Sequence, residues 1–95
     1  MTNTLETNMT VSIFADYLGF LAGTCLFDTL YTNKEYVVVV FERARNVLKH
    51  AKELGIELEL DAAIKNNSKA NAVFVNNDFD MDKFVFAFHN GKLKF

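Results

Sequence analysis

The chain has 95 residues, a net charge of −2 and a single cysteine, and about half of its residues are apolar. This length suits one domain, which we predict at 11–95 after a loose N-terminal arm at 1–10. The slight negative charge disfavours general binding to nucleic acids, and a lone cysteine excludes an internal disulfide.

The cysteine count also bears on location. Chains without disulfides are typical of reducing compartments, and the start of this chain lacks the basic segment of a secretory signal. We therefore expect a cytoplasmic protein.

Phenylalanine is unusually frequent, with ten residues in the chain, while tryptophan and proline are absent. A domain of this size has a small interior, so not all of these large side chains can be buried. The composition predicts an apolar contact patch on the surface.

The segment 11–30 has the apolar spacing of a helix. One row of apolar residues comprises Phe14, Leu18, Leu21 and Cys25. A second row, which recurs every seven residues on another side of the helix, comprises Ile13, Phe20 and Phe27. A helix that is apolar on two sides is either sandwiched or used for association. We predict that the second row, together with Tyr31, forms an interface with a partner or a second copy.

The same segment is about as long as a membrane span, and Gly19 with Gly23 forms a GxxxG motif. Asp16, Asp28 and the absence of flanking basic residues before it argue against a span, and we expect no membrane association. The glycines instead predict close packing against a neighbouring helix.

The segment 32–56 carries both ends of a second helix. Thr32 and Glu35 have capping-box spacing, and Gly55 followed by Ile56 is typical of a helix end. A run of valines leaves an alternative in which 35–41 is a strand. We favour a helix, and the short link after 11–30 then predicts an antiparallel helix hairpin.

Beyond Gly55 the apolar spacing changes to alternation. Ile56, Leu58 and Leu60 alternate with glutamates, which predicts a strand, and 70–75 predicts another. Asn90 and Gly91 form the preferred two-residue turn of a β-hairpin over 83–95. The hairpin register would gather one apolar face from Phe84, Phe86, Phe88, Leu93 and Phe95.

An alternative for this last segment is a helix capped by Asp82 and ended by Gly91. We favour the hairpin. The predicted fold class is therefore α+β, with two layers. The N-terminal antiparallel helix hairpin would pack on a small C-terminal antiparallel sheet of three to four strands.

Three carboxylates, Asp78, Asp80 and Asp82, have the spacing that opens a calcium loop. Lys83 stands where that loop needs glycine, and His89 stands where it needs glutamate. We expect no metal here, but the acidic loop could serve as a contact site for a partner.

Cys25, His50 and His89 are the nucleophile and base candidates, yet Cys25 falls within an apolar row typical of a buried, inert thiol. No glycine-rich phosphate loop or other catalytic motif is present. We therefore predict a protein that is not an enzyme and that needs no cofactor.

The basic residues of the second helix are Arg43, Arg45, Lys49 and Lys52. Glu42 and Glu53 alternate with them, as on an ordinary solvated helix. These four basic residues could contact a polyanion, so the alternative function is a nucleic-acid-associated regulator.

We predict a small protein-interaction module, a homodimer through the first helix, that binds and modulates or inhibits another macromolecule. The prediction rests on the surplus of apolar side chains and on the helix with two apolar sides. The short, proline-free, Asn- and Lys-rich chain also suits an accessory protein of a phage, another virus or a mobile element.

Overall fold

Every regular element in the described part of the chain is a helix. This computed structural model describes the backbone of residues 4–30 and 34–95, and the side chains of 7–26 and 35–95. The elements are α1 (Thr4–Leu30), α2 (Lys34–Glu53), α3 (Glu57–Ile64), α4 (Ser68–Val73), the one-turn 3₁₀ helix η1 (Val75–Asn77) and α5 (Met81–His89).

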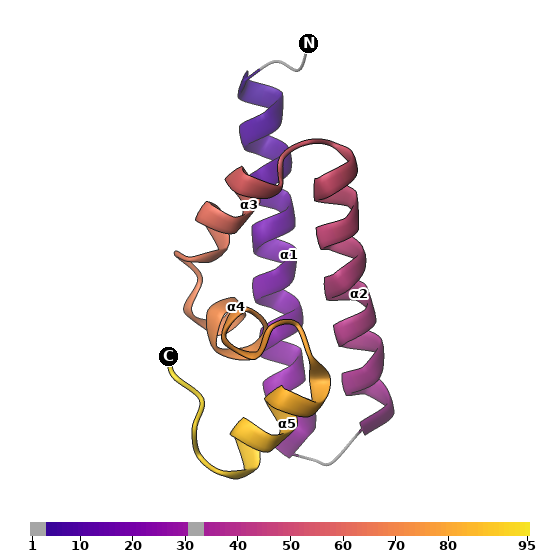
Figure 1. Ribbon diagram of the computed structural model, residues 1–95, viewed down its shortest axis with the longest axis vertical. Helices are drawn as coiled ribbons and strands as arrows, with labels where there is room; N and C mark the ends of the chain where they lie inside the picture. Colours follow the sequence, from indigo (N-terminus) through magenta and orange to yellow (C-terminus); the bar gives the residue numbers. More distant parts are fainter. Residues whose placement is uncertain (1–3, 31–33) are drawn as a thin grey trace.

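The long helix α1 is the centre of the arrangement. It runs most of the length of the molecule, with α2 antiparallel beside it and with α3 and α4 lying across it (Figure 1). The short helix α5 contacts α2 and η1 near the end of α1 that leads into α2. The C-terminal half of the chain therefore packs onto a helix hairpin.

The core lies between α1 and these neighbours. Its largest fully buried side chains include Phe41 of α2, Phe74 between α4 and η1, and Phe84 of α5. The ring of Phe41 lies 5.0 Å from that of Phe74 and 5.6 Å from that of Phe84, between centroids. Burying such a side chain contributes about 1.5–3 kcal/mol, so this cluster ties α2 to the C-terminal half.

The predicted helix hairpin is confirmed. Residues 35–41 belong to α2, so the strand alternative is wrong. Gly55 adopts a φ of 73°, and the N–H groups of Gly55 and Ile56 donate to the carbonyls of Lys52 and Ala51, at 3.1 and 2.9 Å. This is the predicted glycine-closed helix end, with Ile56 buried on it. The first helix begins earlier than predicted, at Thr4, and the capping residue Thr32 lies outside the described residues.

The predicted α+β fold is wrong, because the described residues contain no strand. The alternation of Ile56, Leu58 and Leu60 indicated a strand, yet residues four apart also share one face of a helix. Ile56, Leu60 and Ile64 are buried along one side of α3, while Leu58 is 79% exposed. The acidic residues between them are the solvent side of a helix.

The predicted strand at 70–75 is also wrong, since most of it belongs to α4. Asn67 begins this helix by accepting a hydrogen bond on its side-chain oxygen from the N–H of Ala70, at 3.0 Å. Ala70, Ala72 and Val73 are then buried. The polar residues before Ala70 thus include the cap of a helix.

The predicted C-terminal β-hairpin is wrong for a related reason. Asp80 caps α5, and Gly91 follows its end with a φ of 64°. The Lys92 N–H donates to the carbonyl of Ala87 at 2.8 Å, so Asn90–Gly91 closes a helix. The alternative of a helix ended by Gly91 is right, although its cap is Asp80 and not Asp82. Phe84 is buried, whereas Phe86 is 62% exposed, as a helix requires.

Close packing at the first glycine of the GxxxG motif is confirmed. A Cβ atom built on Gly19 would clash with the side-chain amide of Asn67, the residue that caps α4. Gly23 is different, because a Cβ there would lie 3.8 Å from the nearest atoms, in the Lys69 side chain. Only Gly19 is required for the approach of α4 to α1.

The two glycines therefore make a matched pair for measuring this packing. Gly23→Ala should stabilise the protein by about 0.5–1 kcal/mol, because alanine is the better helix former. Gly19→Ala should instead lower the free energy of unfolding by about 1 kcal/mol or more, since displacing Asn67 outweighs that gain. Urea denaturation of both variants measures the difference, and equal stabilisation by both would contradict the packing of Asn67 on Gly19.

Candidate interaction surface

Large apolar side chains follow the face of α1 that points away from the core. Met9, Ile13, Tyr17 and Phe20 are 57%, 62%, 37% and 63% exposed, respectively. At about 100° per residue they fall within one sector of the helix, roughly opposite the fully buried Leu18. We call these four residues the α1 stripe.

The stripe is exposed because helices cover α1 on one side only. The molecule extends only 17 Å along its shortest axis, which leaves room for about two layers of helices. The inner face of α1 is occupied by α2, α3 and α4. None of the described elements covers the opposite face.

The stripe contains part of the predicted interface. Ile13 and Phe20 are exposed as expected. The side chain of Phe27 and the whole of Tyr31 lie outside the described residues. Met9 and Tyr17 were missed, although the sequence held a signal for Tyr17. Tyr17 lies four residues after Ile13 and three residues before Phe20, which is the spacing of a coiled-coil seam.

By length and composition, α1 could also cross a membrane over Thr7–Leu26. Core helices of globular proteins meet the same criteria. Here the inner side of the segment, with Leu18, Leu21 and Ala22 fully buried, is part of the protein core. The charged Asp16 is exposed on the other side of the same segment. The absence of a membrane partner stays a prediction.

Three of the four basic residues of α2, namely Arg45, Lys49 and Lys52, fall within a sector of about 60° around the helix. Arg43 lies apart from them, by about 120–180°. Arg45 donates a 3.4 Å hydrogen bond to the carbonyl of Phe79, so it faces the loop before α5. Glu42 and Glu53 are exposed on the same helix. The two glutamates border the three clustered basic residues, so the positive side of α2 that the polyanion alternative requires is interrupted by acidic side chains.

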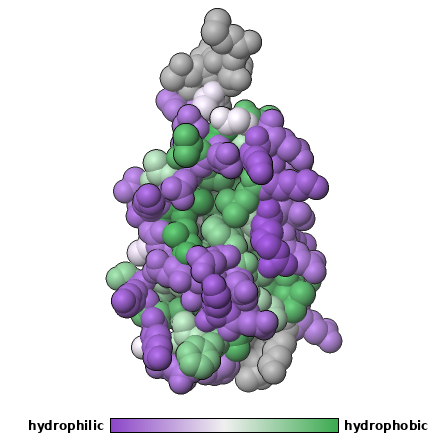
Figure 2. Space-filling view, viewed as in Figure 1, coloured by the Kyte–Doolittle hydropathy of each residue, from purple (hydrophilic) through white to green (hydrophobic). Residues whose placement is uncertain are grey.

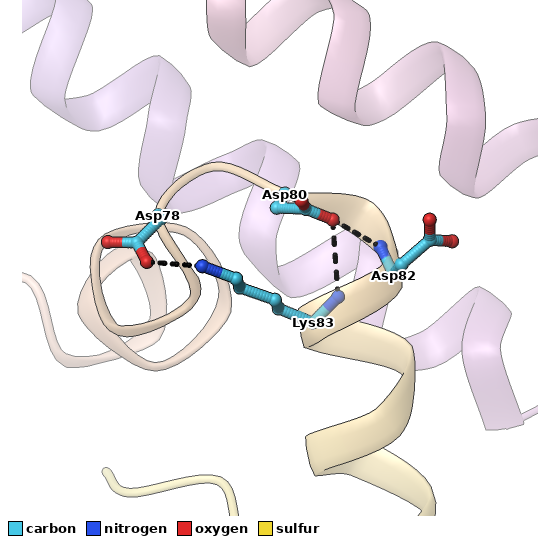
Figure 3. A network of polar contacts seen from close by, with 4 residues as sticks. All are labelled: Asp78, Asp80, Asp82 and Lys83. Atoms are coloured by element: carbon cyan, nitrogen blue, oxygen red, sulfur yellow. Dashed lines mark hydrogen bonds and ion pairs between the residues drawn. The ribbon is translucent and has the colours of Figure 1, made fainter.

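The three acidic residues near α5 diverge and act on the local fold (Figure 3). Asp80 accepts hydrogen bonds from the N–H groups of Asp82 and Lys83, at 2.8 and 3.3 Å. Asp78, with a φ of 55°, pairs with the Lys83 ammonium at 2.8 Å. Among the described residues, no group of three or more His, Cys, Asp or Glu could hold a metal ion. The Asp80 carboxylate thus begins α5.

The hydrogen bond to Asp78, followed by its charge, raises the pKa of Lys83. A raised lysine pKa means that the pair stabilises the fold at neutral pH and loses this effect as the pH rises through the Lys83 pKa, above the ordinary value of 10.5. The pair is exposed, so its contribution at neutral pH is small.

The nucleophile and base candidates lie apart. Cys25 is fully buried, as predicted. His50 is exposed on α2, with its Nδ1 3.7 Å from a Glu53 carboxylate oxygen. His89 is exposed at the end of α5 against the ring of Phe88. Cys25 is thus buried on α1, while the two histidines are exposed on α2 and α5.

Other exposed apolar side chains occur away from α1. Apolar residues are visible along the middle of the face that carries α3, α4 and α5, interrupted by polar ones (Figure 2). Those exposed outside α1 include Leu54, Leu58, Phe86 and Phe95. Phe86 is partly covered by the Lys92 ammonium, 5.4 Å from its ring centroid. The α1 stripe is the longest regular run of such side chains on one described helix.

A pocket of about 300 Å³ lies between the C-terminal tail and η1, and its lining includes Asn77, Lys92 and Lys94. The amide of Asn77 donates to the carbonyls of Ala72 and Val73, at 2.8 and 3.0 Å. This group holds the end of α4 and is not directed at a ligand.

No protein-family model matches the chain, and no curated protein or solved structure shows significant similarity to it. The function is therefore argued from the residues themselves.

The contribution of Asp80 to stability as a helix cap can be separated from the contribution of its negative charge. Asp80→Ala should lower the free energy of unfolding by about 1 kcal/mol, because two N–H groups of α5 lose their acceptor. Asp82→Ala removes an equal charge from the same turn and should cost only a few tenths of a kcal/mol. Thermal denaturation with and without calcium measures both effects, and a calcium-dependent rise in the melting temperature of the unmodified protein would contradict a purely structural role.

Proposed function

We propose that the protein is a small non-catalytic interaction module that binds a helical segment of a protein through the α1 stripe. The observation that carries the proposal is the stripe itself: Met9, Ile13, Tyr17 and Phe20 are all exposed on one face of one helix. Contiguous exposed apolar side chains mark interaction sites more often than ordinary surface.

The spacing of the stripe favours a helix as the bound element. Apolar residues separated by three and four positions are the pattern by which one helix packs along another. Aromatic residues, here Tyr17 and Phe20, are also the side chains enriched at the centres of protein interfaces. Binding at this face would modulate or inhibit the macromolecule that supplies the helix.

The fold supports a role of this kind because α1 is held rigidly. Its inner face is anchored by Leu18, Leu21 and Cys25, all essentially fully buried. The outer side chains are thus presented on a preformed helix, so binding would not require α1 to order itself. The stripe can be changed without disturbing the core.

Photocrosslinking in the cells that naturally contain the protein tests the proposal. A benzoylphenylalanine in place of Phe20 should yield adducts with protein, whereas the same group in place of the 79% exposed Leu58 should yield few. Mass spectrometry of the adducts should locate the attachment on one face of a helix. Equal labelling from both positions would contradict a specific surface, and capture of nucleic acid would favour the alternative regulator.

Phe20→Glu is the matching loss-of-function variant. Because Phe20 is 63% exposed, the free energy of unfolding should change by no more than about 0.5 kcal/mol. Adducts from a crosslinker at Ile13 should nevertheless disappear, since a charge would be buried in the interface. Unfolding of this variant would show that Phe20 belongs to the core, and the proposed surface would be wrong.

A further inference from the structure

Two opposite charges flank one edge of the α1 stripe. Asp16 directly precedes Tyr17 and is exposed. One heptad further along, Lys69 of α4 lies beside Gly23, since a Cβ built on that glycine would be 3.8 Å from both Cδ and Nζ of Lys69. Along α1, positions 16 and 23 are about 10 Å apart.

Neither charge has an ion-pair partner among the described residues of its own subunit. Lys69 is exposed, like Asp16, so both groups are available to a molecule that docks on the stripe. An occupant of the stripe therefore meets a negative group and a positive group on the same edge, one heptad apart.

We propose that the occupant is a second copy of this chain, packed with its α1 antiparallel to the first so that Asp16 of each copy pairs with Lys69 of the other. This proposal rests on the proposed function and names its partner. A two-fold axis perpendicular to the helices places each edge of the stripe against the same edge of the second copy. This edge carries one negative and one positive charge, so it is complementary to the same edge of the second copy.

Three of the four stripe residues, Ile13, Tyr17 and Phe20, agree with this register. In an antiparallel pair, Tyr17 of one copy packs against Phe20 of the other, and Ile13 packs against Thr24. The Thr24 hydroxyl donates to the carbonyl of Leu21 at 2.9 Å, so its hydrogen-bonding need is met within α1. This leaves a small residue opposite the larger Ile13.

The same register brings the charges together. Position 16 of one copy lies within about 3 Å, along the helix axis, of position 23 of the other. The Lys69 side chain lies against α1 at Gly23 and is thus close to the level of Asp16 of the second copy.

A parallel pair would not use the charges. A two-fold axis parallel to the helices places each edge against the opposite edge of the second copy. That opposite edge presents the partly buried Phe14, so Asp16 and Lys69 would face an apolar side chain. The charge pattern thus selects the antiparallel dimer.

The interface is a single helix pair, at the small end of specific interfaces, so association should be measured from about 10 µM to 1 mM. Sedimentation equilibrium of the whole chain should show a dimer that dissociates on dilution. Asp16→Lys and Lys69→Asp should each weaken self-association at least tenfold, because like charges then meet across the seam at both ends.

Mixing these two variants is the decisive step. A copy with Asp16→Lys carries two positive groups and a copy with Lys69→Asp carries two negative ones, so the mixed dimer regains both attractive pairs. Equimolar mixing should restore dimerisation to near the original level. Glu42→Lys and Lys49→Asp, two exposed sites on the far side of α2, are the matched controls and should change self-association less than twofold, alone or mixed.

Two results would overturn the inference. One is a chain that stays monomeric at 1 mM. The other is a dimer whose charge variants are not rescued by mixing, which would indicate a parallel or unrelated contact. The proposed function is judged separately, because photocrosslinks from Phe20 to a different protein would sustain it while this inference fails.

Discussion

The structure depends on one constraint: α1 is apolar on two opposite sides, while the other described helices cover only one of them. The inner side is filled by α2, α3 and α4, and it buries Leu18, Leu21 and Ala22 completely. The outer side keeps Ile13 and Phe20 more than half exposed. The architecture and the proposed function both follow from this division of a single helix.

Small residues and caps make the inner contacts close. Gly19 lets Asn67 approach α1, and the same Asn67 side chain begins α4 by accepting from Ala70 at 3.0 Å. α4 then leads into the buried Phe74, whose ring lies 5.0 Å from Phe41 on α2. A glycine on the first helix thus positions the element that links both halves of the core.

The segment before α5 shows how local strain is accommodated. Asp78 and Phe79 both have left-handed backbone conformations, with φ values of 55° and 54°. Phe79 stacks on Phe74 at 5.5 Å, and its N–H donates to the Phe74 carbonyl at 2.8 Å. These contacts and the Asp78–Lys83 pair offset the cost of the turn that aims α5 back at the core.

The long helices could be predicted from the sequence because their apolar spacing extends over many residues. The later elements were predicted wrongly because short patterns there are typical of both a strand and a helix. Gly55 and Ile56 closed α2 as expected, because a glycine after a long periodic segment has few other uses. Leu58 and Phe86 indicated strands because each lies in an alternating apolar pattern. Alternation over five residues also contains the four-residue step of a helix, so the pattern does not distinguish the two structures. Asn90–Gly91 indicated a hairpin turn, but a left-handed glycine is equally typical of a helix end.

The interaction surface, too, could be predicted only in part from the sequence. The exposure of Ile13 and Phe20 could be predicted from the seven-residue repeat on α1. Tyr17 fitted that repeat and was overlooked. The position of Lys69 beside Gly23 could not be predicted, since it depends on α4 being a helix that docks on α1. Charges supplied by distant elements become visible only in three dimensions.

The division of α1 into a buried and an exposed side can be measured on three side chains. The chain contains three isoleucines, of which Ile13 is 62% exposed while Ile56 and Ile64 are 6% and 1% exposed. Methyl NMR of the dilute protein with a soluble gadolinium chelate reports their contact with solvent. The account predicts strong relaxation of the Ile13 methyl and protection of the other two. Equal protection of all three would show that α1 has no free face, and the account would be wrong.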